Sequence, residues 1–193
     1  MKNPGRIALY ALLACLIAAP FVAAGMTLFA HRAGEAAPPF SLTDQDGKPF
    51  SLIGQRGKAV VLFFGYTHCP DVCPTTLAAI ARAYRSLGSP ASLQVVFVTV
   101  DPKRDTPTAM RTYVSTFDPH FLGLTGDEPA LDQVYKEYGI YRAIDPGGST
   151  ALGYTVSHSA VVFLIDRDGS IVKRFDWQAT PREFAQAFRK VTS

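Results

Sequence analysis

Two nearly continuous apolar runs, at residues 59–64 and 93–100, most constrain how this chain can fold. The first reads Ala-Val-Val-Leu-Phe-Phe and the second Leu-Gln-Val-Val-Phe-Val-Thr-Val. A strand with one solvated face alternates apolar and polar side chains, whereas these runs are rich in β-branched and aromatic residues throughout. We therefore expect two central strands that other elements cover on both faces.

Helical patterns follow each of these runs and recur towards the C-terminus. In the first pattern, Leu77, Ile80 and Tyr84 share one helical face, and Gly88 follows as a stop signal. Thr180 precedes Pro181 as the expected N-cap of the last helix. The expected helices cover residues 74–87, a segment that begins near 107, residues 129–138, and the segment from 181 onward.

Two hairpins complete the expected regular structure. Residues 40–52 alternate apolar and polar side chains around a turn at Asp46-Gly47, and strands at 160–165 and 171–175 flank a second turn. Alternating strands and helices, followed by a hairpin and a helix, predict an α/β fold with a mixed central sheet and helices on both faces. We expect one domain at residues 40–193.

The N-terminal segment is long enough to cross a membrane. No charged residue lies between Ile7 and Ala30, and these 24 residues would form a helix of about 36 Å, against a bilayer core of about 30 Å. Lys2 and Arg6 precede the segment, which favours a cytoplasmic N-terminus and an exported domain. We expect residues 1–32 to be a single-pass anchor in a bacterial inner membrane, with the domain in the periplasm. A cleaved signal peptide is the alternative.

Composition and the linker restrict the partners further. Residues 33–39 contain small residues and two prolines, which predicts a spacer between anchor and domain. The net charge is only +3 and no run of Lys or Arg occurs, so nucleic acid is not an expected partner. Cys15 lies inside the apolar segment, where we interpret it as a membrane-buried side chain. Two cysteines, Cys69 and Cys73, remain for the exported domain.

These two cysteines follow the first apolar run in the order Cys-Pro-Asp-Val-Cys-Pro. A residue before proline favours extended backbone, and Pro74 suits a first helical turn, so Cys73 is a candidate N-cap. A sulfur at a helix N-terminus faces free backbone N–H groups, which favours the thiolate. We therefore expect a loop that presents two ionisable sulfurs at the end of a rigid strand.

Three interpretations of this pair stay open from the residues alone. A structural disulfide is possible in an exported protein, but so short a loop would stabilise the fold little. A redox dithiol fits the strand–loop–helix setting, although the spacing is one residue wider than Cys-x-x-Cys. A soft-metal site needs a further ligand, and two thiolates with one imidazole suit copper.

Four histidines are candidates for that ligand. His31 flanks the apolar segment and His120 occupies an expected surface loop without a recognisable partner. His68 adjoins Cys69, but neighbouring side chains on extended backbone diverge, so it is more readily a tuning or solvated residue. His158 lies in an expected loop before the strand at Ala160, and its role stays open from the sequence pattern alone.

Three blocks of this sequence resemble the signatures of the Sco/SenC family, in the family's order, and the likeness extends from about Phe40 to the C-terminus. The blocks are Phe64-Gly-Tyr-Thr-His-Cys-Pro-Asp-Val-Cys-Pro74, Val100-Asp-Pro-Lys-Arg-Asp-Thr-Pro107 and Tyr154-Thr-Val-Ser-His-Ser159. The resemblance implies a thioredoxin-like fold of the peroxiredoxin type. It also implies that Cys69, Cys73 and His158 bind copper, as Cu(I) or Cu(II). Many members have Asp before the histidine, where this chain has Ser157.

The resemblance further implies that this protein delivers copper to, or matures, the binuclear copper centre of cytochrome c oxidase. Expected partners are the oxidase subunit that carries this centre or another periplasmic copper chaperone, and a thiol reductant. The main alternative is a thiol–disulfide oxidoreductase with Cys69 and Cys73 as its redox pair. A thiol peroxidase fits the context less well, and a copper sensor would share all three ligands.

The segment after the second apolar run allows more than one role. Either Asp105 or Thr106 is expected to cap the helix that begins at Pro107. Asp101 either lies near the cysteine loop or helps to dock a partner, because polar groups at strand ends gather at functional sites.

Overall fold

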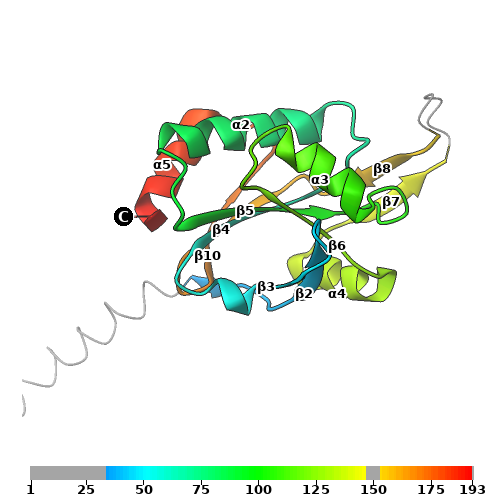
Figure 1. Ribbon diagram of the computed structural model, residues 1–193, viewed down its shortest axis with the longest axis horizontal. Helices are drawn as coiled ribbons and strands as arrows, with labels where there is room; N and C mark the ends of the chain where they lie inside the picture. The colour runs from blue at the N-terminus through cyan, green and yellow to red at the C-terminus, as the bar shows by residue number, and fades with distance from the viewer. Residues whose placement is uncertain (1–33, 147–152, 193) are drawn as a thin grey trace, which may run out of the picture. The chain divides into compact units, whose positions relative to one another are not determined.

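The computed structural model describes residues 34–146 and 153–192, which contain an eight-stranded mixed sheet (Figure 1). Its strands follow the spatial order β1-β10-β9-β4-β5-β6-β2-β3. Their bounds are β1 Glu35–Ala36, β2 Ser41–Asp44, β3 Pro49–Ser51, β4 Ala59–Gly65, β5 Leu93–Thr99, β6 Leu122–Thr125, β9 Val162–Ile165 and β10 Ser170–Phe175.

Helices lie on both sides of this sheet, as the sequence predicts (Figure 1). The helices α2, α3 and α5 lie on one side and α4 on the other. Gly139, whose left-handed φ of 65° suits a residue without a Cβ, ends α4. The bounds are α2 Val72–Ser86, α3 Pro107–Ser115, α4 Glu128–Tyr138 and α5 Pro181–Thr192, with a short 3₁₀ helix, η1, at Ile53–Gln55.

Parallel pairing at the centre of the sheet determines where a site can form. Strand β4 pairs in parallel with β5, and Gly65 lies opposite Thr99 at the carboxyl ends of both strands. Strands β5 and β6 are also parallel, whereas β9 runs antiparallel to β4. The loops that follow β4 and β5 therefore leave the same edge of the sheet, where ligand sites of α/β proteins gather.

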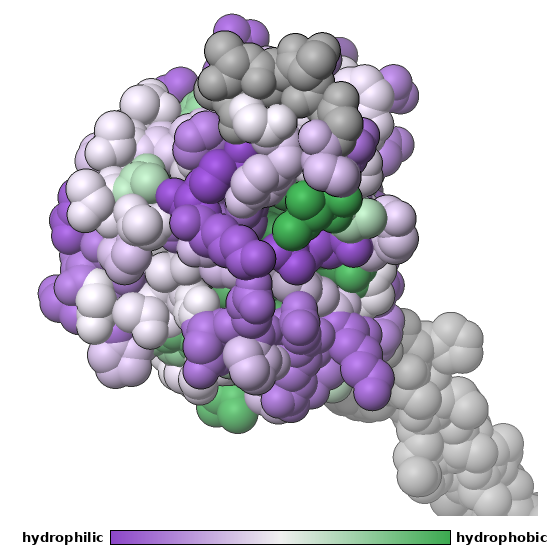
Figure 2. All heavy atoms as spheres, turned by 90° about the vertical axis from the view of Figure 1, so that its right-hand side faces the viewer, coloured by the Kyte–Doolittle hydropathy of each residue, from purple (hydrophilic) through white to green (hydrophobic). Residues whose placement is uncertain are grey.

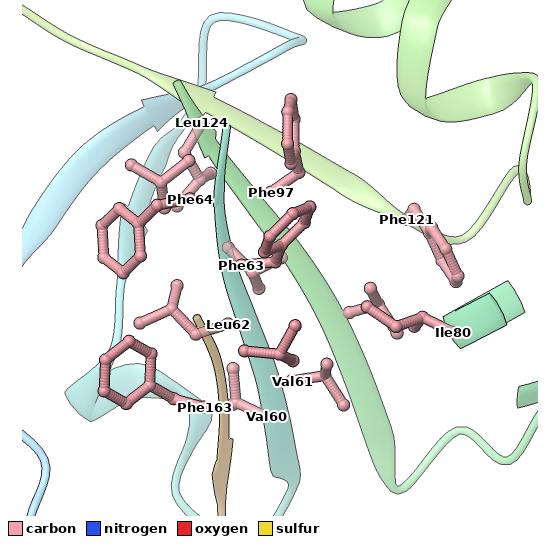
Figure 3. Close-up of a cluster of buried hydrophobic side chains, with 14 of the residues drawn as sticks. Val60, Val61, Leu62, Phe63, Phe64, Ile80, Phe97, Phe121, Leu124 and Phe163 are labelled. Atoms are coloured by element: carbon pink, nitrogen blue, oxygen red, sulfur yellow. The ribbon is translucent and has the colours of Figure 1, made fainter. Parts of the chain in front are cut away.

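The two apolar runs form the core, as expected. All seven residues of β4 are buried, and Figure 3 shows its side chains pointing alternately to the two faces. Phe63 packs against Phe97 at a ring distance of 5.8 Å, while Phe64 packs against Phe163 at 6.1 Å. Fully burying each such side chain contributes about 1.5–3 kcal/mol. This packing makes the end of β4 a rigid platform for the loop that follows it.

A separate two-stranded hairpin carries the candidate histidine. It consists of β7 (Arg142–Asp145) and β8 (Thr155–His158), and His158 lies opposite Arg142. The sequence analysis placed His158 in a loop, and that prediction is wrong. Strand β8 has only one buried side chain, Val156, so its apolar pattern is too short to reveal a strand.

The N-terminal predictions have different outcomes. Glu35 and Ala36, from the expected spacer, pair with β10, so this part of the linker is a short edge strand. The expected anchor at residues 1–32 and Cys15 within it lie outside the described residues. Among residues 34–146 and 153–192, no helix has the length and apolar character needed to cross a membrane.

Candidate metal centre

The cysteine loop connects β4 to α2 at the carboxyl edge of the sheet. Helix α2 begins at Val72, two residues before the expected start, and Asp71 occupies the N-cap position. Cys73 therefore lies within the first turn and is not the N-cap, which corrects the sequence prediction. The Cys73 side chain is fully buried, whereas Cys69 in the preceding loop is half-buried.

Gly65 allows the Cys73 sulfur to approach the end of β4. A Cβ at this position would lie 2.8 Å from Cys73 Sγ and 2.6 Å from the Phe97 ring. Both separations are shorter than real Cβ contacts, and Cys73 and Phe97 are packed on all sides. The absence of a side chain at Gly65 therefore determines how deeply Cys73 can sit.

Cys69 is the thiolate of the pair. Hydrogen bonds from the Cys73 thiol and then from His158 lower the Cys69 pKa to about 4, against the opposing effect of partial burial. The backbone N–H of Cys73, at the start of α2, also donates to Cys69 Sγ over 3.4 Å. The helix N-terminus thus favours a thiolate as expected, but at Cys69 rather than at Cys73.

Cys73 has the opposite character. Its hydrogen bond to Cys69 and its burial raise the pKa of the Cys73 thiol, because both favour the protonated form. Cys73 therefore keeps its proton at neutral pH until a positive charge compensates for the loss. A metal ion bound to the sulfur supplies such a charge.

His158 directs its Nε2 atom at Cys73. Its Nε2 atom lies 3.7 Å from Cys73 Sγ, and its Nδ1 atom lies 3.0 Å from the backbone carbonyl of Ser159. A carbonyl only accepts, so Nδ1 donates to Ser159, and Nε2 is the ring nitrogen that faces the cysteines. Ser157 is exposed, and the Ser159 carbonyl orients the ring, a task for which the family resemblance leads one to expect a carboxylate at position 157.

Tyr66 supports His158 and was missed by the sequence analysis. Its ring meets the His158 ring edge to face, with centroids 5.9 Å apart. Its buried hydroxyl accepts a hydrogen bond of 3.4 Å from the Val156 N–H. Its position directly after the buried run of β4 is the one signal that could have identified it.

Asp105 joins the cysteine loop to the end of β5. It is buried, and it accepts hydrogen bonds of 2.6 Å from the hydroxyls of both Thr67 and Thr99. Burial raises the pKa of Asp105, while these hydrogen bonds lower it. Thr106, not Asp105, caps α3 by accepting from the Ala109 N–H at 3.3 Å. Of the two residues that were expected to cap α3, Thr106 does so, whereas Asp105 links the cysteine loop to the end of β5.

The other described histidines do not join this group. His68 Nδ1 lies 2.9 Å from Thr67 Oγ1, and because the Thr67 hydroxyl donates to Asp105, His68 donates to Thr67. His120 is exposed as expected, but it has a partner, since its Nδ1 lies 2.9 Å from Asp118 Oδ1.

The donor set fits a soft metal ion. For metal–sulfur and metal–nitrogen bonds of about 2.3 and 2.1 Å, as in zinc sites, two ligands of a trigonal ion lie about 3.8 Å apart. The distance from Cys73 Sγ to His158 Nε2 is 3.7 Å. Among residues 34–146 and 153–192, no three His, Cys, Asp or Glu side chains already enclose a metal position.

Comparisons with known proteins agree with this arrangement. The sequence matches the family described as SCO1/SenC over residues 30–193. A SCO2-like protein of Rickettsia conorii is 35% identical over 151 residues, or 78% of this chain and 74% of the relative. Bradyrhizobium japonicum ScoI, solved with copper bound, is 42% identical with a TM-score of 0.73, covering 81% of this chain and 99% of that one.

A plant structure agrees equally well. Arabidopsis thaliana ScoI, also solved with copper bound, is 32% identical with a TM-score of 0.74 and covers 80% of this chain and 96% of that one. The thioredoxin-like arrangement of sheet and helices is therefore shared with solved Sco structures, as the resemblance predicts. The sequence match and the shared fold together show that this chain belongs to the SCO1/SenC family.

Proposed function

We propose that this chain binds one copper ion through Cys69, Cys73 and His158 and passes it on as cargo. The observation that carries the proposal is the position of His158, whose Nε2 faces Cys73 Sγ at 3.7 Å while the Ser159 carbonyl holds Nδ1. Thiolates and imidazole are ligands that copper prefers. Two copper-bound Sco structures share this fold at 42% and 32% identity.

The different states of the two cysteines suit uptake of the ion. Cys69 is half-buried and already a thiolate, because hydrogen bonds from Cys73 and His158 lower its pKa to about 4. The ion meets Cys69 first, and its charge then permits Cys73 to release its proton to solvent. Three protein ligands at the edge of a domain leave a side from which a partner's ligands can displace them.

We propose that the recipient is the copper-bearing subunit of cytochrome c oxidase or another periplasmic copper chaperone. Family membership supports this role. Figure 2 shows a largely hydrophilic face on which the hydrophobic areas are small and separate, which suits brief encounters better than permanent association. An anchor at residues 1–32 would hold the domain near a membrane-embedded recipient and raise its effective concentration there. The periplasmic location follows from the same N-terminal segment.

A thiol–disulfide oxidoreductase is the second candidate. The observation that favours it is the pairing of an accessible thiolate, Cys69, with a buried thiol, Cys73. In that role Cys73 attacks the mixed disulfide that Cys69 forms with a substrate, and a reductant restores both thiols. His158 is then needed only to lower the Cys69 pKa.

Copper titration of the full chain in detergent, reduced and oxygen-free, tests both candidates. We expect one Cu(I) per chain, strongly weakened in His158→Ala and lost in the Cys69→Ser/Cys73→Ser double variant. His120→Ala is the matched control, because His120 is an exposed histidine paired with Asp118. Unchanged copper affinity in His158→Ala, together with rapid dithiol–disulfide exchange, would instead favour the oxidoreductase.

A further inference from the structure

A buried carboxylate follows β5 beside the histidine hairpin. Asp101 is fully buried, and its Oδ1 accepts a hydrogen bond of 2.6 Å from the Tyr154 hydroxyl. Its Oδ2 pairs with the Nε of Arg104, and its backbone N–H donates to Thr99 Oγ1 at 2.8 Å. A charge buried in this way is stable only with such partners, so Asp101 fixes the Arg104 side chain.

Arg104 in turn holds the residue that precedes β8. Its guanidinium carbon lies 3.7 Å from the centre of the Tyr154 ring, and its Nη1 donates to the Tyr154 carbonyl over 3.0 Å. The same group lies 5.7 Å from the centre of the Tyr66 ring. Arg104 therefore contacts both the ring and the backbone carbonyl of Tyr154, and it also reaches the ring of Tyr66.

Both tyrosines lead directly to His158. Tyr154 immediately precedes β8, which His158 ends, and Tyr66 packs against the His158 ring and accepts from the Val156 N–H. The opposite strand is held independently, because Arg142 on β7 donates through Nε to the carbonyl of Val100. The hairpin is thus fastened to residues 100–104 at Arg142 on β7 and at Tyr154, the residue before β8.

We propose that Arg104, fixed by Asp101, is a positioning residue that holds β8 so that His158 completes the metal site. Arg104 acts through Tyr154 and Tyr66 rather than as a ligand, and the inference rests on the proposed copper function. A guanidinium is required because it stacks on one tyrosine ring and donates to a carboxylate and a carbonyl at once. A lysine keeps the charge but cannot make all of these contacts.

Copper affinity in a double-mutant cycle tests this role. Loss of groups that orient a ligand typically weakens metal binding about 10- to 100-fold, and we expect Arg104→Lys to weaken Cu(I) binding by that amount. Tyr154→Phe, which removes only the hydroxyl to Asp101, should have a smaller effect of the same sign. In a His158→Ala background, Arg104→Lys should change the affinity less than about twofold, because no coupled ligand remains.

Lys103→Ala is the matched control, since it removes an exposed cation from the adjacent position. Two results would overturn the positioning role. One is a wild-type Cu(I) affinity in Arg104→Lys. The other is a loss of Cu(I) affinity on Arg104→Lys that is as large in the His158→Ala background as in the wild type. Hydrogen exchange of the copper-free chain gives a second readout. Arg104→Lys, but not Lys103→Ala, should accelerate exchange at the Val156 and His158 amides.

The exchange readout separates this inference from the proposed function. If the wild-type chain binds no copper, the proposed function fails. Faster amide exchange at Val156 and His158 in Arg104→Lys, but not in Lys103→Ala, would still support the positioning of β8. If the wild-type chain binds copper and the exchange of Arg104→Lys equals that of wild type, the positioning role is wrong.

Discussion

The backbone N–H of Cys73 points at the sulfur of Cys69, 3.4 Å away, and this contact distinguishes two cysteines that are equivalent in the sequence. Cys69 lies before the first turn of α2 and accepts from it, whereas Cys73 lies within that turn and is buried by it. One helix N-terminus therefore produces an accessible thiolate and a protected thiol.

Selective alkylation should reveal this difference. We expect iodoacetamide to modify Cys69 of the reduced chain with a rate that stays nearly constant from pH 8 to about 5, because hydrogen bonds from Cys73 and His158 lower the Cys69 pKa to about 4. Cys73 should react slowly throughout, since burial protects it. Peptide mass analysis assigns the site. Preferential labelling of Cys73 would contradict the assignment of the thiolate.

Cys69 should also make stability depend on pH. Its pKa is lowered from about 9 in the unfolded chain to about 4 in the folded one, so its stabilising contribution is complete above pH 9 and disappears as the pH falls to 4. Thermal unfolding of wild type and Cys69→Ser should therefore differ more at pH 8 than at pH 5. A difference that grows towards acid pH would have the wrong sign for a lowered pKa.

Gly65→Ala should disturb both the fold and the site. The added Cβ meets Cys73 Sγ and the Phe97 ring at distances that neither group can accept without moving, and such overpacking typically costs about 1–3 kcal/mol. We expect a lower urea midpoint and faster alkylation of Cys73 as its sulfur is displaced. Gly54→Ala is the matched control, because a Cβ there would meet its nearest neighbour at an ordinary 3.8 Å. Equal effects of both substitutions would contradict the close approach.

The sequence identified most of the fold because its main elements have strong local signals. The buried runs of β4 and β5 and the end of α4 at Tyr138 are all readable from residue pattern, and the structure confirms them. Strand β8 was missed because four residues with one buried side chain have no recognisable period. Its partner β7 lies ten or more residues upstream, so the pairing is tertiary information.

The site was predictable in composition but not in detail. Spacing placed Cys69 and Cys73 together, yet it could not show which of them α2 would bury, because that depends on a helix start two residues earlier than expected. The distance from His158 to Cys73 depends on how β8 packs against Tyr66, a contact between residues 92 positions apart. Arg104 and Asp101 had no visible partner in the sequence, since Tyr154 is distant in the chain.

Asp105→Ala should loosen the cysteine loop. Asp105 accepts from the hydroxyls of Thr67 and Thr99 in a buried position, and removing it leaves these donors without their acceptor, at a typical cost of about 1–3 kcal/mol each. We expect a lower free energy of unfolding and a higher apparent Cys69 pKa in alkylation, because the loop loses its fixed position. Asp168→Ala, at an exposed turn, is the control. A stability loss no larger than that of the control would exclude this role.

Ser157→Asp tests whether this chain needs a carboxylate directly before His158, as the family resemblance leads one to expect. We expect Cu(I) affinity to change less than about threefold, because the Ser159 carbonyl already occupies His158 Nδ1 at 3.0 Å and directs Nε2 at the cysteines. Ser157→Asn is the matched neutral variant. Its side-chain oxygen can accept from His158 Nδ1 but adds no charge, so it separates a hydrogen bond to the ring from a general attraction between the added charge and copper. A tenfold or larger gain in Ser157→Asp alone, with Nδ1–H of His158 shifted in nitrogen NMR spectra, would show that the carbonyl orients the ring incompletely. Unchanged affinity and an unchanged Nδ1–H signal would show that the backbone of Ser159 is sufficient, and that the site tolerates serine at position 157 for this reason.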